Sequence, residues 1–452
     1  MKNLKILPKV ALWGSLALLP FGSIAYVNAQ QSARSDQFRN MDEFFSVYQK
    51  IRSTYVDEVD DQKLIEGAIQ GMLSSLDPHS GFLNKSDFQS LQTQIDGEYG
   101  GLGLSVTMED GAVKVIAPTK DTPADNAGMK SGDYITHLDG KLIVGGTLDE
   151  AVEQMRGKPG TSIRLTVVRP GRDAPFDVNI TRAIIDLKPV NWEVKNDIGI
   201  INITAFSDRT GADVVDALRS VKRSLGKKPL GYIVDLRSNP GGLLNEAVEV
   251  SDAFLESGEI VSERGRNKRN IERWNATPGD FADGLPVIIL VDAGSASASE
   301  IVAGALQDHH RALVMGERSF GKGSVQNVLP LTRETGLRLT VARYHLPSGR
   351  SVQEGGINPD IKVPQISDPD YAKRRTVRES DLRRHLVNEL KQDDEALEKD
   401  STPDPRFDYT IAQLEEKGIE DFQLHYAMET LSRLGKGTIN LARNKGATVS
   451  QK

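Results

Sequence analysis

Apolar strands alternate with amphipathic helices between residues 198 and 316, and this alternation constrains the fold more than any other feature of the sequence. It predicts a largely parallel sheet with helices packed on it. Ligands of such sheets bind at the carboxyl ends of the strands, where Asn239-Pro240-Gly241-Gly242 and Gly294–Ser299 both fall, so we expect these two loops to form a site. The expected strands are Ile198–Ile203, Gly231–Leu236, Pro286–Val291 and Ala312–Gly316, and the expected helices include Gly211–Leu225 and Leu244–Leu255.

The segments on either side of this core differ from it in pattern. Residues from Phe38 to about Ile95 repeat apolar positions at helical spacing, and a glycine-rich strand region begins at Gly97. Beyond Pro364 the sequence is polar and charged, with two helical stripes near Leu382–Leu390 and Phe422–Leu434. We therefore expect a multidomain α/β protein with five parts: a leader, 1–29; an N-terminal helical region, 36–96; a glycine-rich β domain, 97–182; the α/β core, 183–364; and a charged linker with a C-terminal helical tail, 365–452.

The first 29 residues have the pattern of a secretory signal peptide. A basic start is followed by an apolar run, Ala11–Val27, and Val27-Asn28-Ala29 offers a small-residue cleavage site. The alternative is an uncleaved membrane anchor, but Pro20 and Gly22 break the apolar run, which is near the lower limit for a membrane span. The sequence therefore predicts a mature protein outside the cytoplasm, with the periplasm as the simplest case, and a membrane-associated protein if the leader is retained.

Charge and cysteine content exclude several classes of function. The formal net charge of -7 provides no basic surface for nucleic acid, so we expect no nucleic-acid partner. The chain has no cysteine, which excludes disulfides, thiol catalysis and thiolate metal sites.

Three serines, Ser295, Ser297 and Ser299, lie at the start of a helix that follows the strand Pro286–Val291. The run from Ser297 to Glu300 fits a capping box, and structural capping is the ordinary interpretation of such a pattern. A serine at a helix start has a second use, however. The N–H of Ala298 and the positive end of the helix would point to the place where an oxyanion forms.

A nucleophilic serine needs a base. The nearest imidazoles, His309 and His310, lie about three turns further along the same helix; at a rise of ~1.5 Å per residue they cannot reach Ser297. Lys322 lies in a glycine turn after the strand Ala312–Gly316, which returns the chain beside the helix. Burial would lower the lysine pKa from its reference value of ~10.4 and make the neutral amine a usable base. The alternative is a surface lysine in a turn.

The spacing Gly316-x4-Gly321-Lys322 also approaches that of a nucleotide-binding P-loop. Gly323 stands where that motif needs serine or threonine for magnesium, and the order of strand, loop and helix is absent. We therefore reject nucleotide binding.

Residues 97–182 resemble a PDZ domain of the type associated with bacterial proteases. The resemblance rests on the loop Tyr99-Gly100-Gly101-Leu102-Gly103, the Pro-Ala-x-x-Ala-Gly run at 123–128 and the Gly-Asp-x-Ile step at 132–135. In such a domain, backbone N–H groups of the loop bind a chain-terminal carboxylate and a strand edge pairs with the peptide. A glycine-rich hairpin without a ligand is the alternative for the loop alone.

Three further motifs resemble those of the carboxy-terminal processing proteases, also called tail-specific proteases, peptidase family S41. They are Gly294-Ser-Ala-Ser-Ala-Ser-Glu-Ile301, Phe320-Gly-Lys-Gly-Ser-Val-Gln326 and Pro347-Ser-Gly-Arg-Ser-Val-Gln353. The resemblance extends from about Phe38 to Pro364. It implies a crotonase- or ClpP-like βαβ core with an inserted PDZ β-barrel, an N-terminal helical arm and a C-terminal helical tail.

The resemblance also implies roles for individual residues. Ser297 would be the nucleophile, Lys322 the general base, and Gln326 the residue that orients the lysine. The oxyanion hole would use the amide of Ala298 and a glycine of Asn-Pro-Gly-Gly, for which Gly241 and Gly242 both stay open. No metal or cofactor is implied. The expected substrates are proteins or peptides with free apolar C-termini; an adaptor protein and a homo-oligomer through the terminal helices are left open.

The main expectation is a serine endopeptidase that forms an acyl-enzyme, with a PDZ domain that covers the site when it holds no peptide. The alternative is a PDZ-based peptide-binding or chaperone protein whose core is inactive or depends on an adaptor. A trypsin-like heat-shock protease is disfavoured because that class puts its protease before its PDZ domain and uses His, Asp and Ser. An acyl-CoA enzyme of the crotonase type does not fit a signal peptide.

Overall fold

The computed structural model describes residues 39–109, 111–143, 147–267, 269–374, 376–388, 407 and 409–448, with backbone alone for residues 372 and 436–448. The expected signal peptide lies outside the described residues, as does most of the charged linker. The chain divides into two compact units, Met1–Gly71 and Met72–Lys452. A search of the described residues finds no helix with the length and apolar character to cross a membrane.

The first unit is helical in its described part. It holds a helix over residues 39–54 and most of α2 (Asp61–Ser74), whose last turn belongs to the second unit. Arg52 forms an ion pair with Asp61 at 2.8 Å. An apolar pocket between the two helices is lined by Phe44, Val47, Tyr48, Ile51, Lys63, Leu64, Ile65, Gly67 and Ala68.

Residues 104–181 form an antiparallel sheet with a hydrophobic core of its own. The strand order is β3-β4-β5-β7-β8, with β6 paired to β5, so β3 is an edge strand. Helix α5 begins with a capping box: Glu150 N–H donates to Thr147 Oγ1 at 3.2 Å and Thr147 N–H to Glu150 Oε2 at 2.9 Å. The elements are β3 (Leu104–Glu109), β4 (Ala112–Pro118), α4 (Pro123–Asn126), β5 (Tyr134–Leu138), β6 (Lys141–Leu142), α5 (Leu148–Met155), β7 (Ser162–Val168) and β8 (Phe176–Thr181).

A two-stranded ribbon, β2 (Glu98–Gly101) with β9 (Ala183–Asp186), carries the chain into and out of this domain. Before it, α3 (Lys85–Asp96) begins at Asn84, whose side chain accepts a hydrogen bond from Asp87 N–H. The helix ends at Gly97, where φ is 70°, a left-handed conformation that glycine adopts without steric cost.

The core contains the predicted α/β sheet, in the order β10-β11-β12-β15-β16-β19. The strands from β11 to β19 are parallel, and only β10 pairs antiparallel. The parallel sheet expected from the βαβ alternation is therefore confirmed. Its strands are β10 (Val190–Lys195), β11 (Ile198–Ile203), β12 (Gly231–Asp235), β15 (Val287–Val291), β16 (Leu313–Gly316) and β19 (Ile361–Lys362).

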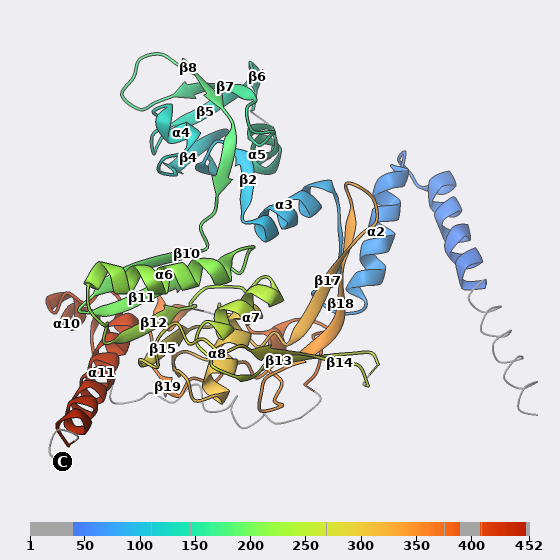
Figure 1. The fold of residues 1–452 in the computed structure, drawn as a ribbon. Coiled ribbons are helices and arrows are strands. Elements are labelled where there is room, and N and C mark those ends of the chain that lie inside the picture. The colour runs from blue at the N-terminus through green and yellow to red at the C-terminus, as the bar shows by residue number, and fades with distance from the viewer. Residues whose placement is uncertain are drawn as a thin grey trace, which may run out of the picture. The chain divides into compact units, whose positions relative to one another are not determined.

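Helices and their side chains cover both faces of this sheet. Because side chains alternate along a strand, neighbouring residues of β12 and of β15 belong to two different core clusters. Val234 and Ile289 belong to one core cluster, together with side chains of α6 (Thr210–Leu225), α7 (Leu244–Asp252) and α8 (Ala298–Asp308). Ile233 and Ile288, their chain neighbours, belong to a second cluster with α10 (Ile411–Glu416) and α11 (Phe422–Thr448). The ribbon of Figure 1 shows α11 running beside the strands of this sheet.

A second sheet was not foreseen from the sequence. It is antiparallel, with the order β1-β18-β13-β14 and with β17 paired to β18. Its long strand β18 pairs with β17 along most of its length, so the segment that follows Lys322 is part of a hairpin. The strands are β1 (Gly81–Leu83), β13 (Gly258–Gly265), β14 (Ile271–Ala276), β17 (Ser324–Pro330) and β18 (Gly336–His345).

The helix predicted near Leu382–Leu390 is wrong for its described residues, 382–388, which are irregular. Polar contacts replace the helical pattern there. His385 Nε2 lies 2.7 Å from Glu354 Oε1, and Asn388 N–H donates to Glu354 Oε2 at 2.7 Å. The segment follows two short 3₁₀ turns, η1 (Tyr371–Lys373) and η2 (Glu379–Asp381). The second predicted stripe, Phe422–Leu434, lies within α11.

We expect Ile289→Ala to lower the free energy of unfolding of the core by about 2–5 kcal/mol, because the side chain is fully buried. Leu331→Ala, at a side chain 52% exposed, is the control and should change it by less than about 0.5 kcal/mol. Denaturation followed by tryptophan fluorescence reports on the core, since Trp192 and Trp274 lie in β10 and β14. Equal effects of the two substitutions would contradict the packing described.

Candidate active site

A cleft of about 680 Å³ lies at the carboxyl ends of β12 and β15, beside β17. It brings together three segments: the glycine loop after β12 (Leu236–Gly242), the serine turn before α8 (Asp292–Ser297) and the lysine turn before β17 (Glu317–Gly323). Its walls are largely apolar, with Phe206, Leu244 and Val325 among the residues that line it. The predicted residues on its surface are Gly241, Gly242, Ser297, Ala298, Lys322 and Gln326.

Ser297 has an unusual backbone conformation, with φ 55° and ψ -113°. A non-glycine residue adopts such angles only where the surrounding structure imposes them, and such residues cluster at functional sites. The helix cap uses other atoms than the serine hydroxyl. Ser297 and Glu300 have the arrangement of the predicted capping box. Its hydrogen bonds run from Ser297 N–H to Glu300 Oε2 at 2.8 Å and from Glu300 N–H to the Ser297 carbonyl at 2.9 Å, and none of the described hydrogen bonds uses the Ser297 hydroxyl. Its hydroxyl is thus left for chemistry.

The two neighbouring serines have structural partners. Ser295 Oγ donates to the Leu236 carbonyl at 2.8 Å, and Ser299 Oγ donates to the Asn239 carbonyl at 2.9 Å. Both serines are fully buried. Their hydroxyls therefore fasten the serine turn to the glycine loop, and Ser297 is the one of the three that lines the cleft.

Glu300 joins the serine turn to the lysine turn. Its fully buried carboxylate accepts the N–H of Ser297 at 2.8 Å and that of Lys322 at 2.9 Å on one oxygen. The other oxygen accepts from Gly321 N–H at 2.7 Å and from the Ser319 hydroxyl at 2.6 Å. Burial raises the pKa of this carboxyl to about 7, and the four hydrogen bonds oppose that rise.

Sequence reasoning missed this role, because it saw Glu300 only as a helix cap. A signal was present, since a carboxylate followed directly by six apolar helix residues, Ile301–Leu306, needs a buried partner. The residues that follow, Ile301, Val302, Ala303 and Ala305, are all buried.

Lys322 lies partly buried in the cleft. Burial is the main cause of a lowered pKa of its ammonium, and the positive charge of Arg338 lowers it further, whereas Glu379, Glu300 and Asp77 oppose the shift. Within the described ranges no carboxylate forms an ion pair with its Nζ, and no hydrogen bond joins Nζ to Ser297 Oγ. The Lys322 ammonium therefore loses its proton more readily than that of a solvent-exposed lysine.

Gln326 lies on β17 and faces the same cleft. Its Nε2 donates to Ser324 Oγ at 2.9 Å and to Thr340 Oγ1 at 3.3 Å, so its described contacts lie with the hairpin and not with Lys322. Tyr344, which the sequence did not single out, places its buried hydroxyl within hydrogen-bond distance of the carbonyls of both Ser297 and Lys322. It is a second link between the serine and lysine turns.

The glycine loop lies against the serine turn. A Cβ at Gly241 would come within 2.8 Å of Ser297 Cβ and 2.9 Å of Ala298 N, and one at Gly242 within 2.1 Å of the Phe206 carbonyl. Gly241 N–H donates to Asn239 Oδ1 at 2.9 Å, whereas the described hydrogen bonds include none from the amides of Gly242 or Ala298. The backbone N–H groups of Gly242 and Ala298 thus have no partner among the described hydrogen bonds.

The predicted peptide-binding loop precedes the edge strand β3. Tyr99, Gly100 and Gly101 belong to β2, and the guanidinium of Arg156 lies 5.0 Å from the centre of the Tyr99 ring. Gly103 has φ 78°, and a Cβ there would meet Thr122 at 2.3 Å. No described hydrogen bond uses the N–H of Leu102 or Gly103. Two amides and an open strand edge thus lie together.

No group of histidine, aspartate and glutamate side chains suited to a metal ion occurs in the described part of the chain.

Family models match three parts of the chain. The model for peptidase family S41 matches residues 197–363, and a PDZ-domain model matches residues 100–180. A model described as the N-terminal domain of the activating protease CtpB matches residues 20–87.

Several named proteins are similar over most of their length. A carboxy-terminal-processing protease of Bartonella bacilliformis is 48% identical over 358 residues, which is 79% of this chain and 82% of the relative. The carboxy-terminal processing protease CtpB of Bacillus subtilis is 36% identical over 352 residues, 77% of this chain and 72% of the relative. Among solved structures, the photosystem II D1 C-terminal processing protease is 26% identical with a TM-score of 0.42, over 76% of this chain and 98% of that one.

The raised pKa of Glu300 predicts a dependence of stability on pH. Between its ordinary pKa of 4.5 and about 7, the folded protein holds a proton that the unfolded chain has lost. The stability that this proton contributes is full below about pH 4.5 and is lost as the pH rises through about 7. The side chain of Glu300→Gln cannot titrate. Between about pH 4.5 and 7 the free energy of unfolding of the wild type should therefore fall by up to about 3 kcal/mol more than that of the variant.

Denaturant unfolding of both proteins at several pH values between about 5 and 8 measures this difference. The slope with pH is the informative quantity, because the glutamine amide would also face N–H donors and lower stability at every pH. Parallel curves for the two proteins would contradict a titrating Glu300.

Proposed function

Because the chain belongs to the carboxy-terminal processing proteases, serine peptidases of family S41 with a PDZ domain, we propose that it cleaves protein chains near their C-termini with Ser297 as nucleophile and Lys322 as general base. The observation that carries the proposal is the buried Glu300 carboxylate, which accepts the backbone N–H groups of both residues at the edge of one cleft. The partners of Ser295 and Ser299 support the choice of Ser297.

The proposed reaction begins with neutral Lys322. Its amine takes the proton of the Ser297 hydroxyl as the oxygen attacks a peptide carbonyl carbon. The negative oxygen of the tetrahedral intermediate accepts hydrogen bonds from Ala298 N–H and from a glycine amide of the loop after β12. The free amide of Gly242 supports that glycine as the donor, since the amide of Gly241 is bonded to Asn239.

Collapse of the intermediate breaks the peptide bond. The leaving amine takes the proton from Lys322, and the acyl group stays on Ser297 as an ester. Water then attacks the ester carbonyl and gives a proton to Lys322, which passes it to the Ser297 oxygen as the C–O bond breaks and the acid leaves. This restores both the serine hydroxyl and the neutral lysine. Gln326 would orient the lysine once a substrate has changed the geometry of the cleft; its present contacts are with the hairpin of β17 and β18.

Substrate choice is assigned to the PDZ domain. The free amides of Leu102 and Gly103 would bind the carboxylate of a chain end, and the open edge of β3 would pair with the residues before it. We also propose that the mature protein acts in the periplasm, because residues 1–29 have the pattern of a signal peptide. We further propose that its βαβ core is related to those of crotonases or ClpP. The adaptor protein and the terminal-helix oligomer stay predictions.

A second candidate, a peptide-binding or chaperone protein with an inactive core, is favoured by one observation. The serine hydroxyl and the lysine amine are not hydrogen-bonded to each other in the described structure. In that case binding of unfolded chains would survive Ser297→Ala together with the biological role.

The dyad is tested with an unfolded substrate that carries an apolar C-terminal tag. We expect Ser297→Ala and Lys322→Ala each to lower the cleavage rate by at least about 10³-fold, because the nucleophile and its base act as a unit. Lys188→Ala, which changes an exposed lysine of the core, is the control and should cleave as the wild type does. Cleavage that survives in Lys322→Ala would refute the dyad, and cleavage by none of the proteins would favour the second candidate.

The role of the PDZ domain is tested by the chemistry of the substrate end. A tagged peptide with a C-terminal carboxamide lacks the charge that the amides of Leu102 and Gly103 would bind, so we expect its KM to rise about tenfold or more with little change in kcat. Gly103→Val should abolish the difference between acid and amide, since a Cβ there meets Thr122. Equal KM values for both peptides with the wild type would rule out carboxylate recognition.

A further inference from the structure

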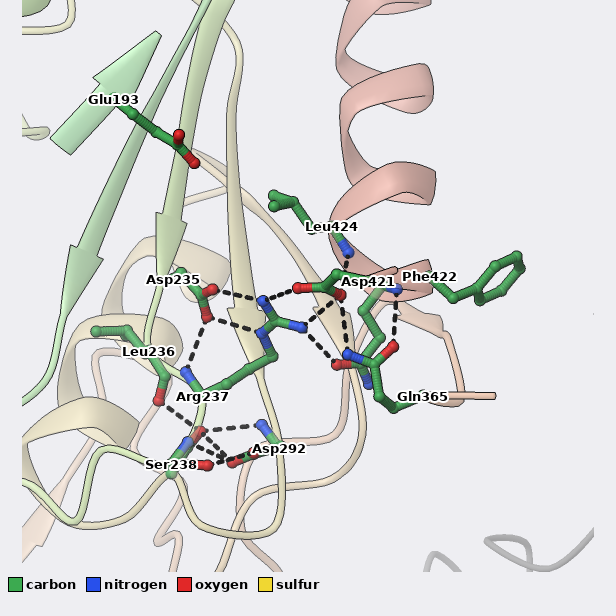
Figure 2. Close-up of polar contacts among 12 residues, drawn as sticks. Glu193, Asp235, Leu236, Arg237, Ser238, Asp292, Gln365, Asp421, Phe422 and Leu424 are labelled. Atoms are coloured by element: carbon green, nitrogen blue, oxygen red, sulfur yellow. Dashed lines mark hydrogen bonds and ion pairs between the residues drawn. The ribbon is translucent and has the colours of Figure 1, made fainter. Parts of the chain in front are cut away.

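The chain beyond residue 363 lies outside the match to the family S41 model, yet its last helix reaches the core. Helix α11 packs on the face of the sheet that holds Ile233 and Ile288. The residue before its first turn, Asp421, lies at the carboxyl end of β12, where the glycine loop begins (Figure 2). A segment distant in sequence therefore meets the chain just before the proposed oxyanion donors.

Arg237 is held between two aspartates at this point. Its Nε and Nη2 donate to the two oxygens of Asp235 at 2.8 and 2.6 Å. Its Nη1 and Nη2 donate to the two oxygens of Asp421 at 2.9 and 2.7 Å, as Figure 2 shows. Paired hydrogen bonds of this kind fix the plane of a guanidinium as well as its position. The arginine side chain is only 14% exposed, so the ion pairs are partly shielded from water.

Asp421 accepts two further hydrogen bonds in the fold. It accepts Leu424 N–H at 3.0 Å, which caps the start of α11, and the side-chain amide of Gln365 at 2.8 Å. Burial alone would raise the pKa of its carboxyl, but the hydrogen bonds and charge of Arg237 outweigh burial and lower it. The carboxylate is therefore ionised at neutral pH and links α11, the segment at Gln365 and Arg237.

From Arg237 the contacts continue to the serine turn. The next residue, Ser238, has φ 57° and donates its N–H and its hydroxyl to the two oxygens of Asp292 at 2.8 and 3.1 Å. Asp292 directly follows β15, and it also accepts Gly294 N–H at 2.9 Å. Hydrogen bonds between Ser238 and Asp292 thus join the glycine loop to the serine turn near their first residues. Asp421 binds Arg237, the residue before Ser238, as Figure 2 shows.

We propose that Asp421 is a positioning residue: by holding Arg237 against Asp235, it fixes the direction in which the chain leaves β12 and so the place of the Gly241–Gly242 amides beside Ser297. This inference rests on the proposed function of Ser297. An oxyanion donor must lie within about 0.2 Å of its ideal distance to act fully, so a small shift of the loop weakens the transition state. The ground-state complex, which lacks the oxyanion, is little affected.

Asp421→Asn is the direct test. Asparagine still caps a helix, so the start of α11 is kept, but its neutral amide cannot accept both N–H groups of Arg237. We expect kcat to fall about 10- to 100-fold with KM within about twofold of the wild type. Glu429→Gln is the matched control, because Glu429 is an acidic residue of the same helix that pairs with Arg433 and is 49% exposed; its kcat should not change.

A second readout separates positioning from a general loss of structure. A peptide aldehyde forms an oxyanion on the serine, whereas the matching peptide alcohol does not. The affinity of Asp421→Asn for the aldehyde should fall by the same factor as kcat, with the affinity for the alcohol unchanged. Asp421→Glu keeps the charge and should keep more of kcat than Asp421→Asn does, and it serves as the test if Asp421→Asn fails to fold.

The outcomes distinguish this inference from the proposed function. If Ser297→Ala loses cleavage but Asp421→Asn keeps the wild-type kcat, the inference alone is overturned. The same holds if Asp421→Glu folds but keeps no more of kcat than Asp421→Asn does. A parallel fall in affinity for aldehyde and alcohol would also overturn it, since that result indicates a structural effect. Cleavage that does not depend on Ser297 would instead overturn the proposed function.

Discussion

The carboxylate of Glu300 is the interaction on which the candidate site depends. One buried side chain accepts hydrogen bonds from Ser297, Lys322, Gly321 and Ser319 and so holds the start of α8 beside the turn before β17. A buried carboxylate is costly unless it is hydrogen-bonded, and these four donors offset part of the cost of its burial. The same contacts explain why the Ser297 hydroxyl need not cap the helix and why its backbone holds strained angles.

Around this centre, each loop is fastened by polar contacts at its base. Asn239, Ser295 and Ser299 tie the glycine loop to the serine turn, and Tyr344 lies between the serine turn and the lysine turn. Arg237 extends the arrangement to Asp421 and α11. The rigid parallel sheet sets the strand ends, and these contacts set the loops, so the reacting groups rely on backbone geometry from several distant parts of the chain.

The sequence was sufficient for features that depend on local pattern. Strands β11, β12, β15 and β16, the helices that follow β11, β12 and β15, and the serine and lysine turns follow from apolar periodicity and glycine placement. The sequence was insufficient where the structure depends on contacts between residues that are far apart in the chain. Arg237 and Asp421 are 184 residues apart. Glu300 and Lys322 are separated by the rest of α8 and by β16, and β18 pairs with β1 and β13, which lie far from it along the chain. The helix predicted near Leu382–Leu390 failed because Glu354 binds that segment.

The central claim is that Ser297 forms an ester with the substrate and that Lys322 is needed for it. Acid quenching of the wild-type enzyme within its first turnover, followed by digestion and mass spectrometry, tests this directly. We predict an acyl adduct on the peptide that contains Ser297, located at that serine and absent from Lys322→Ala. An adduct at Ser295, Ser299 or any other residue, or an equal amount of adduct without Lys322, would contradict the account.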